Sequence, residues 1–158
     1  MLVLRLCSNM KTGQELFLAV AKLRAGFGIV VQAFRPECVA SEKHLELSLH
    51  LARKAEKENK MMAKSLDNEF LLFASAGTKM NDAIAKSGVK DPADFILATD
   101  CKAEKKKEIL SALSASEKKI AFADAKTLAK EFVLSEAALT NFSAEELVLE
   151  KVALARLS

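Results

Sequence analysis

The stretch SLDNEFLLFASAGTKMNDAIAKSGVK, residues 65–90, contains the clearest structural signals in this chain. Ser65 is a good helix N-cap, and Asp67 and Glu69 fall in the first turn, where a carboxylate interacts favourably with the helix dipole. The residues that follow are apolar on nearly every side until Gly77, and a helix of this kind is usually buried. The sequence therefore predicts a central core helix that ends at Gly77.

A short second helix is predicted directly after this one. Thr78 is expected to cap it, and Gly88 would be the left-handed residue beyond its end, with Val89 packed back onto the helix. The face turned toward the core would consist of Met80, Ala83 and Ile84. We therefore interpret the whole stretch as a buried helix, a tight polar corner and a short helix.

Residues 43–51, KHLELSLHL, allow two interpretations. Polar and apolar residues alternate, which is typical of a half-buried strand. However, the segment has no β-branched residue, Ser41 is a good N-cap, and no turn signal follows, so we predict a helix of about five turns. Its leucines would form two stripes on opposite sides, so the helix is either sandwiched in the fold or offers one stripe to a partner. The stripes are Leu45, Leu49 and Ala52, and Leu47, Leu51 and Ala55.

The rest of the chain contains short strand patterns and amphipathic helices. Gly26 and Gly28 are expected to end the first helix, and Pro36 the second strand. Ser143 and Glu146 form an S-x-x-E capping box before the last helix. Strands are predicted at residues 2–7, 29–34, 95–98 and 119–122, and helices at residues 14–23, 102–113, 128–132, 135–139 and 144–157.

The composition favours a globular protein. Of the 158 residues, 51% are hydrophobic and 28% are charged, and two Pro and five Gly leave room for long helices. The sequence shows no internal repeat, low-complexity tract or linker. We therefore predict a single α+β domain over residues 1–158, in which several helices pack on a small mixed sheet.

The sequence also indicates a cellular compartment. No apolar run approaches the roughly 20 residues that cross a bilayer. The N-terminal MLVLRLCSNMKTG lacks a basic segment before its apolar part, so we interpret it as a strand and not as a signal. Cys7, Cys38 and Cys101 are odd in number and have no CxxC spacing, which argues against a disulfide framework or a zinc site. We expect reduced thiols and a cytoplasmic protein.

Catalytic and metal-binding motifs are not recognisable in the sequence. On a helix, His44 and His50 would lie about 240° round the axis from each other and could not share one metal. The patterns GxGxxG, GxxxxGK[ST] and GxSxG are absent. The pair Glu145 and Glu146 is explained by the favourable first turn of a helix. We therefore expect no metal, no cofactor and no enzymatic activity of its own.

The basic residues are the remaining functional signal. The net charge of +3 is too small to indicate nucleic-acid binding by itself. KAEKKK, residues 102–107, clusters four lysines at a predicted helix start, and Lys79, Lys86 and Lys90 lie on or near the short helix. Such charges either solvate a surface or contact phosphates. Since there is no Tyr or Trp, base recognition would have to use Phe, Arg or apolar pockets.

Three blocks of the chain, which together cover most of the sequence, have a recognisable pattern. The features are Glu69, Leu71–Phe73, Ser75–Gly77, Met80, Ala83–Ile84 and Gly88–Val89 in the first block; Val39, Ser41, His44 and Leu45 in residues 31–52; and Glu150, Lys151, Ala153 and Leu154 in residues 132–157. In these features the chain resembles the family of the small non-catalytic subunit of the KEOPS complex, the PRPK-binding protein family. One departure concerns the corner: many relatives have Arg-Gln before an Ile, whereas this chain has Thr78, Lys79 and Met80, so Lys79 is the only charge left there.

The resemblance implies an α+β fold without enzymatic activity. It implies binding to the small atypical protein kinase/ATPase of KEOPS, a complex that forms threonylcarbamoyl-adenosine on tRNA through a different catalytic subunit. It also implies recruitment of tRNA through the 3′ CCA end. On this basis the candidate RNA contacts are Lys79, Lys86 and Lys151. The candidates for structural support or apolar partner contact are Leu71, Phe73, Met80 and Ile84.

Two other functions are compatible with the sequence. The first is a helical adaptor that binds only a protein partner, with the lysines serving as solvating charge. The second is a small metabolic enzyme, which requires a pocket with converging titratable groups. The sequence does not allow us to assemble such a pocket.

Overall fold

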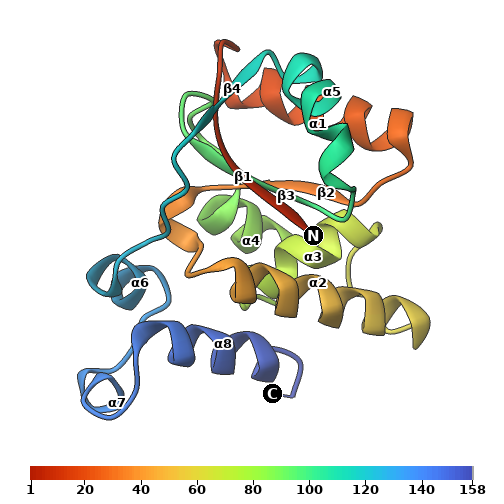
Figure 1. Ribbon diagram of the computed structural model, residues 1–158. Helices are drawn as coiled ribbons and strands as arrows, with labels where there is room; N and C mark the ends of the chain where they lie inside the picture. The colour runs from red at the N-terminus through yellow and green to blue at the C-terminus, as the bar shows by residue number, and fades with distance from the viewer. Residues whose placement is uncertain (158) are drawn as a thin grey trace. The chain divides into compact units, whose positions relative to one another are not determined.

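The computed structural model describes residues 1–157 and has an α+β fold, as predicted (Figure 1). Its contacts divide the chain into two compact units. The sheet unit consists of Met1–Pro36 and Gly88–Ala121, and the helical unit consists of Glu37–Ser87 and the described chain from Phe122 onward. Each unit therefore combines two separate segments of the sequence.

The sheet unit contains four strands in the order β2-β3-β1-β4. All three strand pairs are antiparallel, so the prediction of a mixed sheet is wrong. The predicted strand at 119–122 is also wrong, because the last strand lies earlier and pairs with β1 from Arg5 to Ser8. The strands are β1 (Leu2–Ser8), β2 (Val31–Phe34), β3 (Phe95–Thr99) and β4 (Ala115–Lys118).

Two helices share a hydrophobic core with this sheet: α1 (Gly13–Phe27), and α5 (Lys106–Ala112), which follows the 3-10 turn η2 (Ala103–Lys105). Gly26 lies inside α1, and only Gly28 ends the helix, with φ +61° and its N–H bonded to the Arg24 carbonyl. The buried core consists of Leu4, Leu6, Leu16, Val20, Leu23, Val31, Ala33, Phe95, Leu97, Ile109 and Leu113.

The helical unit is built around α2 (Glu42–Lys57), which contacts both α3 (Leu66–Ala74) and α8 (Ala144–Leu154). The long helix predicted from Ser41 is confirmed, and Ser41 caps it by accepting the His44 N–H. The leucine stripes are explained by this sandwiched position. The capping box of Ser143 and Glu146 is also confirmed. The other helices are α4 (Met80–Ser87), α6 (Ala125–Glu131) and α7 (Glu136–Leu139), and the 3-10 turn η1 (Pro36–Cys38) joins the units.

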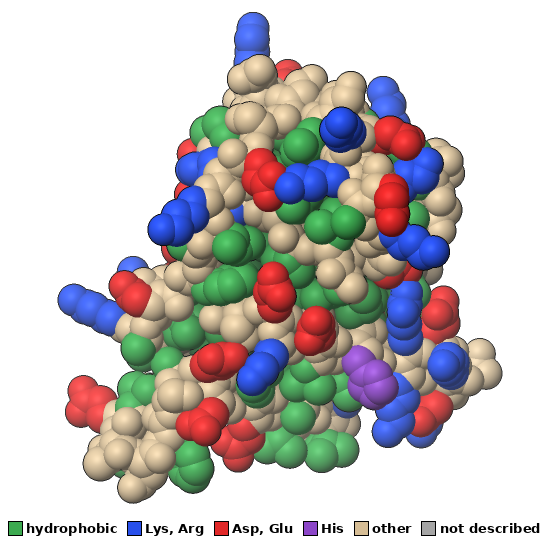
Figure 2. All heavy atoms as spheres, in the orientation of Figure 1, with side chains coloured by type: hydrophobic (Ala, Val, Ile, Leu, Met, Phe, Trp, Pro, Cys, Tyr) green, Lys and Arg blue, Asp and Glu red, His purple; other side chains and the backbone are tan. Residues whose placement is uncertain are grey.

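The two units differ in charge. The sheet unit has 12 basic and seven acidic side chains, a net charge of +5, whereas the helical unit has 12 basic and 14 acidic side chains, a net charge of −2. In Figure 2 side chains of both signs are interspersed, with hydrophobic side chains exposed between them. Within the described residues, no helix combines the length and the apolar character needed to cross a membrane.

Candidate partner-binding site

The corner between α3 and α4, residues 75–79, is fixed by backbone hydrogen bonds. The Gly77 N–H bonds to the Leu72 carbonyl at 3.0 Å, and the Ala76 N–H bonds to the Phe73 carbonyl at 2.9 Å. This is a Schellman arrangement, whose left-handed position is held by Ala76 with φ +53°. The helix thus ends at Ala74, before the predicted Gly77. A Cβ at Gly77 would lie 2.8 Å from the Ser75 hydroxyl oxygen, so any other residue there would displace this hydroxyl.

Lys86 of α4 supports this corner from within the unit. Its ammonium group donates to the Ser75 carbonyl at 2.9 Å and lies 3.7 Å from the ring centre of Phe132. The carbonyl is one of those left unpaired at the end of α3, where a cation also interacts favourably with the helix dipole. Lys86 is therefore held by the fold and is not presented to solvent like a typical surface lysine.

His44 supports the end of the same helix. The Ala40 N–H donates to its Nδ1 at 3.2 Å, so Nε2 carries the ring proton and donates to the Ala74 carbonyl at 2.9 Å. Its ring packs edge-on against the ring of Phe132, with 5.8 Å between the two ring centres. Burial lowers the pKa of His44 to about 4, against a smaller opposing effect of the hydrogen bond to Ala74. The imidazole is therefore neutral and structural near pH 7.

A groove of about 710 Å³ lies beside the corner, and we call it the corner groove. Two apolar side chains of its lining are exposed: Val133 is 82% exposed and Leu154 is 48% exposed. Exposed apolar groups that gather in one place are typical of a surface that binds a partner. The lining residues are Ala76, Gly77, Thr78, Asp82, Val133, Leu134, Ser135, Ala138, Leu147, Glu150, Lys151, Leu154 and Ala155.

The four predicted apolar residues have different environments. Leu71 and Phe73 are buried, which agrees with structural support. Met80 is half-buried, and Ile84 is 50% exposed, so the prediction that Ile84 faces the core is wrong. The inner face of α4 is instead formed by Ala83 and Ser87.

The end of α4 also differs from the prediction. Among the described glycines only Gly28 has a positive φ, so Gly88 is not a left-handed cap. Val89 does not fold back onto Ile84, because it packs against the core of the sheet unit.

The three predicted lysines are not equivalent. Lys79 is exposed at the corner, and Lys151 lies on α8 and lines the corner groove. Lys86 is the partly buried support described above. The structure thus brings Lys151 to the corner through the tertiary fold, although 72 positions separate it from Lys79 in the sequence.

Sequence reasoning missed the residues between α6 and α7. Val133 has φ +51°, an uncommon conformation for a β-branched residue, and the Leu134 N–H bonds back to the Ala129 carbonyl at 2.9 Å. Two adjacent apolar residues, Val133 and Leu134, placed where one helix stops and another starts are the signal that could have identified this rim.

The polar groups in and around the corner are mostly engaged within the helical unit. Within residues 1–157, no group of three or more His, Cys, Asp or Glu side chains could hold a metal ion. The N–H groups of Ser75, Ala76 and Gly77 and the His44 ring nitrogens bond within the fold. The exposed lining of the corner groove combines the apolar Val133 and Leu154 with the charged Asp82, Glu150 and Lys151. Such a groove is suited to an apolar segment of another macromolecule.

Comparison with known proteins identifies a family. No curated protein matches the chain. Residues 21–156 match the family model described as kinase binding protein CGI-121, and this match includes both the corner and all segments that line the corner groove. The chain therefore belongs to the CGI-121 family of kinase-binding proteins.

Proposed function

We propose that this protein is a non-catalytic subunit of the KEOPS tRNA-modification complex. In this role it binds the small atypical protein kinase/ATPase of the complex and helps to recruit tRNA by its 3′ CCA end for threonylcarbamoyl-adenosine formation. The observation that carries the proposal is the match of residues 21–156 to a kinase-binding family. We also propose that the protein acts in the cytoplasm and that the whole chain functions as one domain.

The kinase is proposed to dock on the corner groove and the adjoining face of α4. Val133, Leu154 and Ile84 offer exposed apolar surface in the helical unit. The corner is preorganised by its backbone hydrogen bonds and by Lys86, so little conformational entropy is lost when a partner binds. Leu71 and Phe73 act from below as support, and Met80 contributes a half-buried contact.

The tRNA contact is proposed for Lys79 and Lys151. Both ammonium groups belong to exposed residues of the helical unit, and a phosphate needs no more than a positioned cation to bind without sequence readout. Lys86 is proposed to act indirectly, because it positions the corner that carries Lys79.

Kinase binding is tested by titration calorimetry with the KEOPS kinase from the same organism. Ile84→Glu and Leu154→Glu should each weaken binding by about tenfold or more, because each places a charge in a desolvated apolar contact. Met62→Glu is the matched control, since Met62 is 56% exposed in the same unit and does not line the corner groove. Equal affinity of all three variants for the kinase would overturn this docking surface, and absence of binding by the unmodified chain would overturn the kinase role.

The RNA role is tested by filter binding of tRNA with and without its 3′ CCA. Affinity should fall steeply between 50 and 200 mM salt, as counterion release requires. The salt dependence is the slope of the logarithm of the binding constant against the logarithm of the salt concentration. Lys79→Ala and Lys151→Ala should each make this slope shallower by about one, whereas Lys64→Ala should not. Affinity that is insensitive to salt, or to removal of the CCA end, would contradict the proposed contact.

One observation favours a second candidate, a protein-only adaptor. Asp82 and Glu150 line the corner groove beside Lys151, and the helical unit carries a net charge of −2. Such a surface repels a phosphate backbone more than it attracts one. Tight kinase binding together with no measurable tRNA binding at 50 mM salt would establish this alternative.

A further inference from the structure

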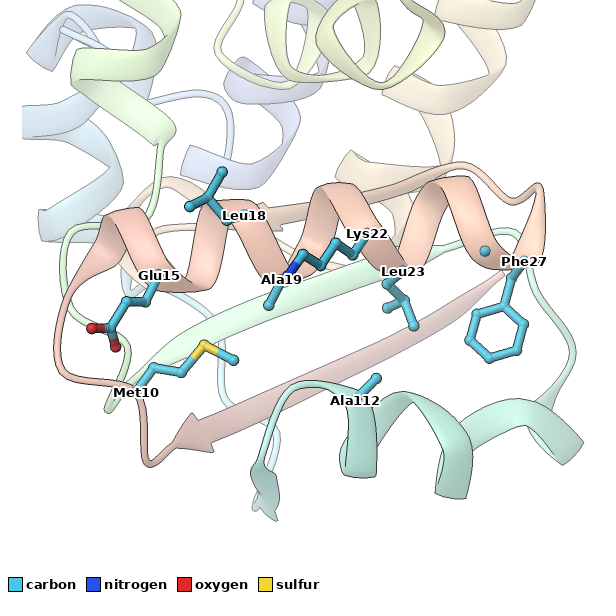
Figure 3. A pocket seen from close by; sticks show the side chains of 9 residues that line it. Met10, Glu15, Leu18, Ala19, Lys22, Leu23, Phe27 and Ala112 are labelled. Carbon is cyan, nitrogen blue, oxygen red and sulfur yellow. The ribbon is translucent and has the colours of Figure 1, made fainter.

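Grooves in the two units have walls that are held together in different ways. A groove of the sheet unit, of about 600 Å³, lies between α1 and α5, and in Figure 3 Leu23 and Phe27 project from α1 toward Ala112 of α5. Leu23 and Ile109 of α5 are buried in one hydrophobic core, so apolar packing holds these two walls. Apolar packing is non-directional. The walls of the corner groove are connected instead by a directional contact between charged side chains.

The end of α8 forms one wall of the corner groove, and we call it the α8 wall. Val148 and Val152 are four residues apart on one side of the helix, and both are fully buried. Ala155, the C-cap, keeps helical backbone angles, so Arg156 continues this buried side by one more turn. Leu154 projects from another side and lines the corner groove. The inner side of α8 thus ends in a charged residue, although a buried helix side is normally apolar throughout.

Arg156 connects the α8 wall to α3. Its Nη2 donates to Glu69 Oε1 at 2.7 Å, and its guanidinium carbon lies 4.4 Å from the ring centre of Phe73. Glu69 is fully buried, and its Oε2 accepts the N–H groups of Met62 and Ala63, so the carboxylate is itself fixed in place. A charge-assisted hydrogen bond from a guanidinium to such a carboxylate is strong and directional.

Phe73 takes part in the opposite wall of the groove as well. Its carbonyl accepts the Ala76 N–H at 2.9 Å, and Ala76, Gly77 and Thr78 line the corner groove. The ring of Phe73 therefore contacts Arg156, while its backbone fixes the corner. Because one residue takes part in both contacts, the position of the α8 wall relative to the corner depends on Arg156.

We propose that Arg156 is a positioning residue for kinase binding, which holds Leu154 and Lys151 of the α8 wall in place opposite the corner. Arg156 does not line the corner groove; together with Phe73 it lines a separate groove of about 500 Å³. It therefore acts on a partner in the corner groove through Leu154 and Lys151, and not by direct contact. This inference rests on the kinase docking surface proposed above.

The test is titration calorimetry of the full chain with the KEOPS kinase from the same organism. Arg156→Lys keeps a positive charge beside Glu69 but loses the planar group over Phe73 and the fixed donor geometry of the guanidinium. Affinity for the kinase should fall by about tenfold, because the α8 wall is no longer preorganised. Lys60→Ala removes an exposed ion pair with Glu58 in the same unit, and as the matched control it should leave the affinity unchanged.

A double-mutant cycle with Leu154→Ala separates positioning from stability. In the unmodified chain Leu154→Ala should weaken kinase binding by about tenfold. In the Arg156→Lys background the same change should cost about threefold or less, because Leu154 is no longer held where the kinase meets it. Amide hydrogen exchange in residues 151–157 should also become faster in Arg156→Lys, while exchange in β1 and β3 should not change.

Phe73→Leu covers the case in which Arg156→Lys does not fold. It keeps the ion pair between Arg156 and Glu69 and removes the ring beneath the guanidinium. Affinity for the kinase should fall by about threefold, and the cost of Leu154→Ala should again be smaller than in the unmodified chain.

Two results would show that Arg156 only stabilises the fold. One is a folded Arg156→Lys variant that binds the kinase as tightly as the unmodified chain, and the other is an equal cost of Leu154→Ala in both backgrounds. If Leu154→Ala has no effect even in the unmodified chain, the docking surface itself is wrong, and the role of Arg156 falls with it.

Discussion

The sheet unit and the helical unit bury polar groups to very different extents. In the sheet unit the buried polar side chains are Ser8 and Thr99, and backbone ladders between four strands supply the hydrogen bonds. The helical unit has no strand among its described residues and buries His44, Asp67 and Glu69 together with three serines. Its helices are therefore connected by side chains that each require a specific partner.

This difference predicts which unit loses more stability when a polar side chain is replaced. A backbone ladder survives most substitutions, because every residue type provides the same N–H and C=O. A buried charge that loses its partner retains the full cost of desolvation. The helical unit, which carries the proposed kinase and tRNA contacts, should therefore respond most strongly to single polar substitutions and to pH.

The largest effect is expected at Glu69. Its carboxylate is fully buried and accepts Arg156 Nη2 at 2.7 Å and the Met62 and Ala63 N–H groups at 3.0 and 2.8 Å. Glu69→Ala leaves all three donors without this acceptor and should lower the free energy of unfolding by about 4 kcal/mol. Urea denaturation followed by circular dichroism measures it, because the chain has no Trp or Tyr for fluorescence.

The matched substitution in the sheet unit is Asp94→Ala. Asp94 bonds Arg5 through both carboxylate oxygens, at 2.8 and 2.7 Å, but the pair is partly exposed to solvent. Its loss should cost at most about 1 kcal/mol. Equal losses for the two variants would contradict the contrast between the units.

The next effect is a pH dependence carried by His44. Its pKa is about 4 in the folded protein and about 6.5 when unfolded, so the unfolded state binds the proton more readily. Stability is therefore unaffected above pH 7 and is lost as the pH falls from about 6.5 toward 4. Between pH 7 and pH 5 the free energy of unfolding should fall by roughly 2 kcal/mol.

His44→Gln removes this titration and is the control. Its stability at pH 7 will be lower, because the hydrogen bonds to Ala40 and Ala74 are disturbed. The relevant quantity is the difference in the free energy of unfolding between pH 7 and pH 5. In the variant this difference should shrink by most of the roughly 2 kcal/mol. An unchanged pH dependence would show that other groups cause it.

The elements that the sequence predicted well are those whose signals are local. Ser41, Ser65 and Ser143 each cap the helix expected of them, because an N-cap is decided within four residues. The strands at β1 and β3 were found because their runs of branched and aromatic residues are buried. These features need no knowledge of the tertiary fold.

The predictions that failed depend on distant partners. Strand β4 has a polar sequence, Ala115–Lys118, and becomes a strand by pairing with β1 more than 100 residues earlier. Ile84 was assigned to the core from helical spacing, but spacing does not say which side of a short helix meets a neighbour. The corner groove is assembled from the α3–α4 corner, α4, the α6–α7 connection, α7 and α8, so its rim could not be predicted from any single stretch.

A smaller contrast, between α1 and α6, concerns how the two helices end. Helix α1 of the sheet unit ends at Gly28 in the left-handed conformation, with open space around its Cα. Gly28→Ala should lower the free energy of unfolding by about 1 kcal/mol, since the added Cβ meets no atom and only the backbone conformation is penalised. Gly26→Ala, inside the same helix, is the control and should raise stability, because Ala is the better helix former and space is open there too.

Helix α6 of the helical unit ends in the same conformation at Val133, where Gly would be expected. Val133→Gly relieves a left-handed strain of about 1–2 kcal/mol, but glycine loses more conformational entropy on folding, so the net gain in stability should be about 0.5 kcal/mol. The same substitution removes the most exposed apolar side chain of the corner groove. If the kinase docks on this groove, the Val133→Gly variant will have a higher melting temperature and a lower affinity for the kinase. If Val133 is purely structural, stability will rise with no loss of affinity. Ala76→Gly tests the same strain at a corner residue with only a methyl group to lose, so it should raise stability with little loss of kinase affinity.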